Sequence, residues 1–523
     1  MSSNIPVTTK RLIACCDGTW MDSDNGYEEP GFLKSEGTLQ VPSNVTRISR
    51  CFKRRCSDGK LQIISYESGV GTGSNTLDSI TGGAFGLGLS ERVRETYSYL
   101  CANYMDGDEI ILVGYSRGAF TVRSVAGMVG ALGLLTREGV EHFYPIFKDM
   151  QHWRDPDYKD PFPNVPFSNK PKGTNAAKEY RARLAKLGYT RVKQDGGDGE
   201  LIKIKAVCVW DTVGSLGIPR TYKWHDTSLS DRIEHAFHAL ALDETRPAFS
   251  PAVWERLPAN KLTTDLRQVW FPGNHANCGG GWEDQGMANI TLAWMMDQLA
   301  SVGVEFDTLS LERVFDQTKA YYEASSLASK GKKKKGVFVR WAVDQIFDSN
   351  SPIRPWGLGA INKASSLLYK LSGQTIRSPG LYKSTDLKTK LDADQFLMDT
   401  NERIHSTVRV RLACKGLGLD DKAVWDCPAL LKSWELTRTH EKFDDPVPCY
   451  PDWDPKSGED GFGRPNDWSK GRWIWKFCGD EKNAPTDKKQ RIMVEEPLGP
   501  YERHLLKLSA GTPNIFEFAD SQE

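Results

Sequence analysis

The sequence predicts an α/β fold in which a doubly wound, mostly parallel sheet precedes a helical segment and a small antiparallel C-terminal part. Five short apolar runs each end in a loop that contains Gly or Asp. Helical patterns separate several of these runs, as in a series of βαβ units. The 523 residues are also enough for a large core and several subdomains.

The five apolar runs predict buried parallel strands because they are short, continuous and bounded by turn residues. They span residues 12–16, 61–66, 110–113, 204–210 and 266–271. Helices are expected among them, at residues 89–104, 119–134 and 229–243. Because the carboxyl ends of parallel strands share one edge of a sheet, the loops after the five runs should converge there and form a site.

Residues 149–200, which are rich in Pro, Asp and Lys, interrupt this rhythm. They predict an insertion with one helix near residues 175–187, either a cap over the site or a decorated crossover. An amphipathic helix is expected at residues 289–302, packed on the sheet rather than on a membrane. The predicted organisation is an α/β-hydrolase-like domain at 1–300, a helical and loop segment with a Lys-rich loop (330–335) at 301–383, and a Trp-rich subdomain with a strand at 472–477 in residues 384–523.

The composition excludes several classes of protein. Lys plus Arg and Asp plus Glu both number 68, so no overall charge favours nucleic acid. No stretch approaches the length of an uncharged membrane-spanning helix, and residues 1–10 lack the apolar core of a signal peptide. Eleven cysteines without a metal-ligand cluster indicate reduced core thiols. We therefore expect a cytoplasmic protein without a transmembrane segment.

The third predicted strand leads into Gly114-Tyr115-Ser116-Arg117-Gly118 and then into a helical pattern. This is the context of a nucleophile elbow, in which a sharp turn exposes the serine at the strand end. The two glycines leave room for the strand and the helix to approach each other. In a chain with 47 Gly, however, the motif alone also fits an ordinary surface serine, so the neighbouring loops decide between the two interpretations.

A serine nucleophile needs a base within hydrogen-bond reach and an acid that orients the base. His275 is the best placed of the nine histidines, because it follows the fifth strand in a turn fixed by Pro272 and Gly273. His405 lies much further along the chain and is the alternative base; a structural histidine is the competing interpretation of both.

Asp211 follows the fourth strand and is the candidate acid. With it, the chain order is Ser116, Asp211, His275, which is the order of α/β-hydrolase triads. Asp243 is the alternative acid, although its place at the end of a predicted helix favours an ion pair with Arg246.

Backbone N–H groups near the serine are candidate oxyanion donors. Arg117 supplies one at the helix N-terminus, and Gly18 or Thr19, after the first strand, supplies a second. Asp17-Gly18-Thr19 is also similar to the loop of aspartate-nucleophile phosphohydrolases, but their nucleophilic Asp would stand at Cys15. A metal-assisted hydrolase that uses Asp17 and Asp211 remains an alternative.

His235 and His238 lie three residues apart on the predicted helix at 229–243, a spacing that a metal pair can have. No nearby carboxylate or cysteine spacing completes such a site. We therefore expect neither a metal nor a cofactor.

Six motifs follow one another along residues 10–300. They are Cys16-Asp17-Gly18-Thr19-Trp20, Gly69-Val70-Gly71-Thr72, the elbow with Ala119, Trp210-Asp211-Thr212-Val213, Ala241-Leu242-Asp243-Glu244-Thr245-Arg246 and Pro272-Gly273-Asn274-His275. Together they resemble the catalytic domain of the type VI secretion phospholipase-effector family, and Glu402-Arg403-Ile404-His405-Ser406 is similar to an element of its fungal members.

The resemblance implies an α/β-hydrolase-like fold, a triad on Ser116, Asp211 and His275, and ester hydrolysis on phospholipids. One position departs from the family pattern. Members commonly have Asp two residues after the histidine, whereas this chain has Asn277. Any electrostatic role of that Asp near the base is weakened here.

The leading hypothesis is a serine esterase that acts on a lipid or small ester, phospholipids among them. A non-catalytic protein that keeps the fold for lipid or partner binding is the alternative from another class, motivated by Asn277 and the Trp-rich C-terminal part. A peripheral contact with an anionic membrane surface is the minority interpretation of the Lys-rich loop. The oligomeric state is not indicated.

Overall fold

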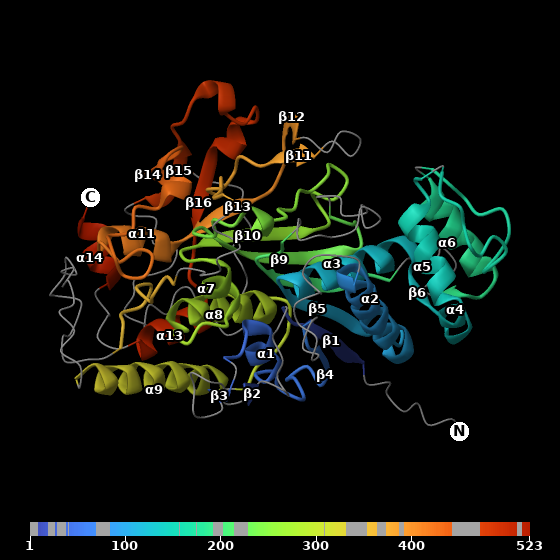
Figure 1. Ribbon diagram of the computed structural model, residues 1–523, viewed down its shortest axis with the longest axis horizontal. Helices are drawn as coiled ribbons and strands as arrows, with labels where there is room; N and C mark the ends of the chain where they lie inside the picture. Colours follow the sequence, from blue (N-terminus) through green and yellow to red (C-terminus); the bar gives the residue numbers. More distant parts are fainter. Residues whose placement is uncertain are drawn as a thin grey trace.

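A ten-stranded sheet forms the centre of the computed structural model (Figure 1), in the order β14-β15-β16-β13-β10-β9-β8-β5-β1-β4. The structure describes residues 9–18, 27–28, 38–39, 41–69, 84–155, 157–173, 175–191, 202–213, 229–307, 309–330, 353–362, 373–385, 392–441, 471–509 and 515–522. From β16 to β4 each strand is parallel to its neighbours, whereas β14 and β15 run antiparallel at one edge. The predicted mostly parallel α/β sheet is confirmed.

The strands of this sheet have the following bounds: β1 (Lys10–Cys16), β4 (Leu61–Glu67), β5 (Glu109–Tyr115), β8 (Ile204–Trp210), β9 (Ile233–Ala241), β10 (Asp265–Phe271), β13 (Glu402–His405), β14 (Trp434–Thr439), β15 (Arg472–Phe477) and β16 (Ile492–Glu496). Short two-stranded pairs lie outside it: β2 (Tyr27–Glu28) with β3 (Thr38–Leu39), β6 (Leu134–Leu135) with β7 (Thr190–Arg191), and β11 (Lys383–Thr385) with β12 (Asp392–Phe396).

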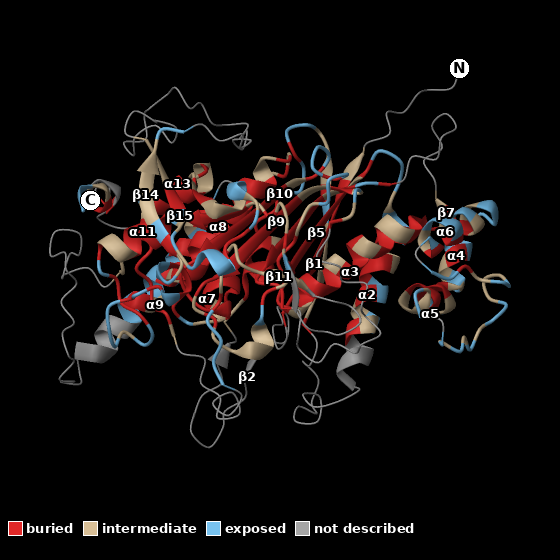
Figure 2. Ribbon diagram, turned by 90° about the horizontal axis from the view of Figure 1, so that it is seen from above, coloured by how far each residue is buried: buried red, intermediate tan, exposed pale blue. Residues whose placement is uncertain are grey.

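Helices cover both faces of the sheet, as a doubly wound fold requires. Ile13 and Cys15 of β1 pack into a cluster with one set of helices, whereas Leu12 and Ala14 face the other set. The first set is α1 (Asn44–Ser49), α8 (Gly286–Ala300), α9 (Ser310–Lys330) and α13 (Pro500–Leu508), and the second is α2 (Ala84–Asn103) and α3 (Arg117–Leu132). Figure 2 shows the buried sheet between these layers.

The five predicted strands occur as β1, β4, β5, β8 and β10, and two of the predicted helices as α2 and α3. The helix predicted at 229–243 is wrong, because residues 233–241 form the central strand β9. β9 pairs in parallel with β8 on one side and β10 on the other. These tertiary hydrogen bonds override the helix propensity of its alanines and leucine.

The predicted helix at 289–302 is α8, whose residues 287–299 are all buried. It packs on the sheet as expected, but it is buried all round rather than amphipathic. Within the described parts of the chain, no helix combines the length and apolarity needed to cross a bilayer. Residues 331–335 of the Lys-rich loop lie outside the described residues. The ten cysteines that the structure describes are unpaired, and nine of them are buried.

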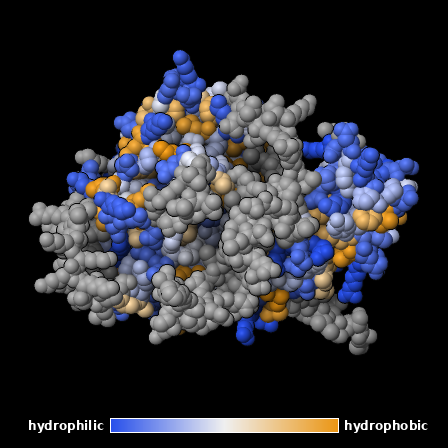
Figure 3. Space-filling model, in the orientation of Figure 1, coloured by the Kyte–Doolittle hydropathy of each residue, from blue (hydrophilic) through white to orange (hydrophobic). Residues whose placement is uncertain are grey.

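The predicted insertion at 149–200 contains α6 (Ala176–Lys186), which was predicted, and shares a lobe with α4 (Arg137–Glu141) and α5 (Phe143–His152), most of which precede it. Its surface in Figure 3 is mainly hydrophilic. Arg181 of α6 donates to the carbonyl oxygens of Gly130 and Ala131 near the end of α3. These residues lie about 20 Å along α3 from Ser116, so this contact is remote from the elbow, and the choice between a cap and a decorated crossover stays a prediction.

The C-terminal part adds strands to the same sheet. β13 pairs in parallel with β10, β16 with β13, and the predicted strand at 472–477 is β15. Trp434 and Trp475 are fully buried in this region. The boundary at residue 384 stays a prediction.

The strand order reverses at β1, which pairs with β4 on one side and β5 on the other. The chain therefore leaves β1 in one direction and returns in the other. In open α/β sheets, such a switch point opens a crevice at the carboxyl ends of the strands. Gly18 follows β1 and Ser116 follows β5 at this place.

Candidate active site

Ser116 stands at a strained turn between β5 and α3. Its backbone has φ 55° and ψ −115°, a conformation that a residue with a Cβ rarely adopts. A Cβ on Gly118 would overlap the backbone of Cys16, and one on Gly114 would lie 2.6 Å from the Gly118 carbonyl oxygen. The two glycines therefore permit the close approach of strand and helix. Strain of this kind concentrates at functional sites.

Asp211 and His275 meet at the carboxyl ends of β8 and β10. Asp211 Oδ2 lies 2.6 Å from His275 Nδ1, and both side chains are buried. Asp211 also has a positive φ, 41°. Two of the three predicted catalytic residues thus form a direct His–Asp pair, and both Asp211 and Ser116 occupy strained backbone positions.

The imidazole of His275 packs between two aromatic rings. The ring of Tyr115 lies 4.8 Å away between centroids, and that of Phe249 lies 4.9 Å away in an edge-on arrangement. The Tyr115 hydroxyl donates to the backbone carbonyl of His275 over 3.2 Å. Because Tyr115 directly precedes Ser116, these contacts hold the imidazole beside the elbow.

Asn277 supports the loop that carries His275. His275 opens α7 (His275–Gly279), and Asn274 caps this helix by accepting the N–H groups of Ala276 and Asn277. Asn277 closes the capping box by accepting the Asn274 N–H, and its amide donates to the Ala360 carbonyl over 2.9 Å. The Asn277 amide thus supplies a donor to a backbone carbonyl oxygen, which the carboxylate of an Asp at this position would repel.

Arg377 is the main further partner of Asp211. Its two terminal nitrogens lie 2.5 Å from Asp211 Oδ1 and 3.0 Å from Oδ2. Burial alone would raise the pKa of Asp211, but Arg377 and His275 outweigh burial and hold this pKa well below its usual range. Asp211 is therefore ionised, and His275 Nδ1 must carry the proton that they share.

The predicted alternative acid, Asp243, contacts the backbone of the histidine loop instead. It follows β9 rather than a helix, and its Oδ2 accepts the Gly273 N–H over 2.6 Å. Its other oxygen accepts the Trp425 indole N–H. The ion pair of Arg246 that was expected with Asp243 is formed with Glu244.

The predicted alternative base, His405, has a structural environment. It is fully buried at the end of β13, where Nε2 lies 2.6 Å from Glu502 Oε1. Its Nδ1 accepts the N–H of Thr407 and thereby caps α11 (Ser406–Ala413). Burial lowers the pKa of His405 to about 3, so the imidazole is neutral. These contacts anchor the C-terminal part to the sheet.

The candidate oxyanion donors differ in their surroundings. Arg117 is the first residue of α3, directly after Ser116. Gly18 lies beside Ser116, since a Cβ on Gly18 would come 3.4 Å from the Ser116 Cβ. The Gly18 N–H, however, donates to Asp17 Oδ1 over 2.6 Å. Thr19 lies outside the described residues.

The spacing of His235 and His238 that a metal pair could have does not bring their side chains together. His235 and His238 stand on a strand rather than a helix, and a spacing of three places them on opposite faces. His235 pairs with Asp265, and His238 Nε2 accepts the Thr212 N–H. Among the described residues, no group of three or more His, Cys, Asp and Glu side chains is arranged to hold a metal ion.

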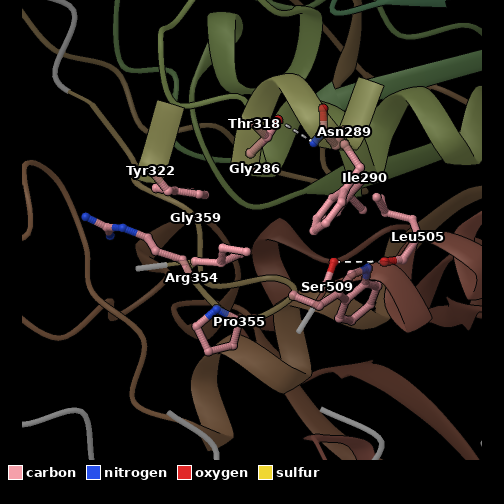
Figure 4. Close-up of a pocket in the computed structure, with 13 residues that line it drawn as sticks. Gly286, Asn289, Ile290, Thr318, Tyr322, Arg354, Pro355, Gly359, Leu505 and Ser509 are labelled. Carbon is pink, nitrogen blue, oxygen red and sulfur yellow. Dashed lines mark hydrogen bonds between the residues drawn. The ribbon is translucent and has the colours of Figure 1, made fainter. Parts of the chain in front are cut away.

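A small pocket lies between α8, α9, α13 and residues 353–359 (Figure 4). Its wall includes Asn289, Tyr322, Arg354 and Ser509. None of its lining residues is Ser116, Asp211 or His275, so this pocket is separate from the three candidate catalytic residues.

Comparison with known proteins assigns the chain to a family. Residues 10–298 match the family model for the "T6SS, Phospholipase effector Tle1-like, catalytic domain". The chain belongs to this family. A relative from Saccharomyces cerevisiae, "Uncharacterized protein YEL023C", is 25% identical over 272 residues, which are 48% of this chain. The chain spans only 33% of that relative's length.

The part that matches the Tle1-like domain carries all three candidate catalytic residues but not Arg377. Sequence reasoning missed Arg377 because it lies in a stretch with no periodic pattern, 166 residues from its partner Asp211. Glu244, which accepts the backbone N–H of His275 over 3.3 Å, falls within a recognised motif. The motif Ala241–Arg246 was therefore the one sequence signal that could have pointed to Glu244.

Proposed function

We propose that the protein is a serine esterase that hydrolyses carboxylic esters of lipid-like substrates, phospholipids among them. The observation that carries this proposal is the 2.6 Å contact between Asp211 and His275, formed beside a strained elbow serine. Membership of a family described as a phospholipase effector catalytic domain supports the lipid class of the substrate.

In the proposed mechanism, Ser116 Oγ attacks the ester carbonyl carbon and His275 Nε2 takes the hydroxyl proton. Asp211 fixes the tautomer, because its carboxylate accepts a hydrogen bond from the Nδ1–H group. Nε2 therefore carries no proton and can act as the base. The imidazolium then returns the proton to the leaving alcohol. Water hydrolyses the acyl-serine in the same way, and the acid is released. The N–H of Arg117 at the start of α3 is the proposed oxyanion donor.

The metal-assisted alternative is less well supported. Both oxygens of Asp17 already accept protein hydrogen bonds: Gly18 on one, and Ser43, Thr46 and Tyr66 on the other. Asp211 is likewise held by Arg377 and His275. A metal ion would have to displace these partners from both carboxylates. The non-catalytic alternative was motivated by Asn277 and by the Trp-rich C-terminal part. The Asn277 side chain is engaged by Asn274 and Ala360 and holds the loop that carries His275, which weakens the first of these motives.

A fluorophosphonate probe tests the proposal. Wild-type protein should be labelled at Ser116, as mapped by mass spectrometry, and should hydrolyse a short p-nitrophenyl ester. Ser116→Ala and His275→Gln should lose both the labelling and the ester hydrolysis. The melting temperature of Ser116→Ala should equal that of wild type. His235→Gln removes a second His–Asp pair, at the opposite end of β9, and should keep both. Wild-type protein that is folded but neither labelled nor active contradicts the proposal.

The lipid class is tested separately. Wild-type protein should release fatty acid from phospholipid vesicles, and Ser116→Ala should not. If the protein hydrolyses the soluble ester but releases no fatty acid from vesicles, the serine esterase mechanism stands and phospholipids are rejected as its substrates.

A further inference from the structure

We propose that Arg377, which lies beyond the family-matched residues 10–298, is a positioning residue of the catalytic unit. It acts through Asp211 by fixing the orientation and the effective charge of that carboxylate. This inference rests on the proposed esterase function, because it assigns a role in that same site.

The geometry of the Arg377 guanidinium is that of a two-point clamp. Its Nη1 donates to Asp211 Oδ1 over 2.5 Å and its Nη2 donates to Oδ2 over 3.0 Å. The same nitrogens donate to the carbonyl oxygens of Ala241 and Phe249. Four hydrogen bonds therefore connect Asp211 to the end of β9 and to the residue whose ring packs on His275.

Burial makes this pair strong. The side chains of Arg377 and Asp211 are 3% and 0% exposed, so solvent screens little of their attraction. Planar guanidinium groups match a carboxylate at two points, which fixes its rotation as well as its charge. With the rotation fixed, Oδ2 stays directed at His275 Nδ1.

The clamp also shares the charge of Asp211 between two cations. When His275 accepts the serine proton, the carboxylate stabilises the resulting imidazolium. Because Arg377 neutralises part of that carboxylate, the stabilisation is weaker than an isolated aspartate would give. Arg377 therefore tempers the stabilisation that Asp211 gives to the imidazolium.

The segment that carries Arg377 is itself anchored on both sides. The Thr375 N–H donates to the Thr245 carbonyl over 2.9 Å, and the Gly380 N–H donates to Glu402 over 2.8 Å. The Trp434 indole donates to the Pro379 carbonyl over 3.1 Å. These contacts hold the segment to the loop after β9 and to the C-terminal strands, which explains how a remote residue reaches Asp211 with defined geometry.

The test compares Arg377→Met and Arg377→Lys with wild-type protein, using the pH profile of kcat/KM on a p-nitrophenyl ester. Arg377→Met should lower kcat/KM by about 10- to 100-fold, as loss of an outer partner does. The acid limb of its profile should move up by about one pH unit, because Asp211 is no longer neutralised. Arg377→Lys keeps the positive charge but cannot contact both carboxylate oxygens at once. Its acid limb should therefore return towards that of wild type, while its kcat/KM stays reduced.

Arg403→Met is the matched control, because Arg403 and Glu496 form an equally buried pair on β13 and β16. This variant should lose thermal stability and keep both the rate and the acid limb. If Arg377→Met lowers the rate but leaves the acid limb where it is in wild type, Arg377 has only a structural role and the proposal is overturned. An unchanged rate in Arg377→Met would overturn it as well. Should Arg377→Met fail to fold, the lysine variant decides by the same two readouts. Failure of Ser116 labelling in wild-type protein would instead reject the esterase itself.

Discussion

Replacement of Asn277 by Asp should destabilise this protein. The Asn277 side chain is 1% exposed. Its carbonyl oxygen accepts the Asn274 N–H over 3.1 Å, and its amide donates to the Ala360 carbonyl over 2.9 Å. Asp would keep the acceptor and lose the donor, so two oxygens would face each other in a buried place.

The expected cost at pH 8 is about 1–3 kcal/mol, the usual cost of a buried polar group left without its partner. Burial would raise the pKa of the introduced carboxyl above its unfolded value. A carboxyl whose folded pKa is raised contributes stability at low pH and loses it as the pH rises through that pKa. In its protonated form, the group can donate to Ala360 again. The cost should therefore shrink at pH 5.

Urea unfolding of Asn277→Asp and wild-type protein at pH 5 and pH 8 measures both effects. Asn289→Asp is the matched control, because Asn289 is equally buried but its oxygen accepts from the guanidinium of Arg47. A carboxylate there would face a buried cation, so its cost at pH 8 should be smaller. Equal stability of Asn277→Asp and wild type at pH 8, or a cost that does not depend on pH, would refute the reasoning.

Two further substitutions test the elbow and a neighbouring carboxyl. Gly118→Ala places a Cβ against the Cys16 backbone and should abolish fluorophosphonate labelling at a cost of about 1–3 kcal/mol; Gly59→Ala, which meets no neighbour, should keep labelling. Burial raises the pKa of Glu67 from 4.5 to about 7, so wild-type stability should fall as the pH rises between these values. Glu67→Gln should therefore gain on wild type by on the order of 1–3 kcal/mol more at pH 8 than at pH 4, and a difference that is equal at both pH values would exclude this role.

Hydropathy predicted five of the strands that are buried through apolar side chains, but it took the apolar strand β9 for a helix and missed β13, whose buried side chains are largely charged. β8 is apolar along most of its length and was predicted with its observed bounds. β13 contains Glu402, Arg403 and His405, all of them buried. Arg403 is compensated by Glu496 on β16, a partner that no local pattern reveals. A strand of this composition looks like a surface loop in the sequence.

The candidate site divides in the same way. Ser116 and Asp211 directly follow strands and His275 follows β10 after a three-residue turn, so local patterns place all three candidates at the same edge of the sheet. The partners of these loops could not be predicted, since they belong to distant segments. Ala360 and Asn362 contribute backbone carbonyls to Asn277 and Asn274, and a carbonyl is present in every residue type.

These partners also bear on where the functional unit ends. Three segments beyond residue 298 satisfy buried polar groups of the loops that hold the candidate acid and base: Arg377 on Asp211, Ala360 on Asn277 and Trp425 on Asp243. Each buried group left unpaired would cost about 1–3 kcal/mol, which is a large share of the roughly 5–15 kcal/mol that stabilises a typical folded domain. The edge of β10 would also lose its partner β13. In this protein the family-matched region therefore depends on the segments after it for the geometry of its own candidate site.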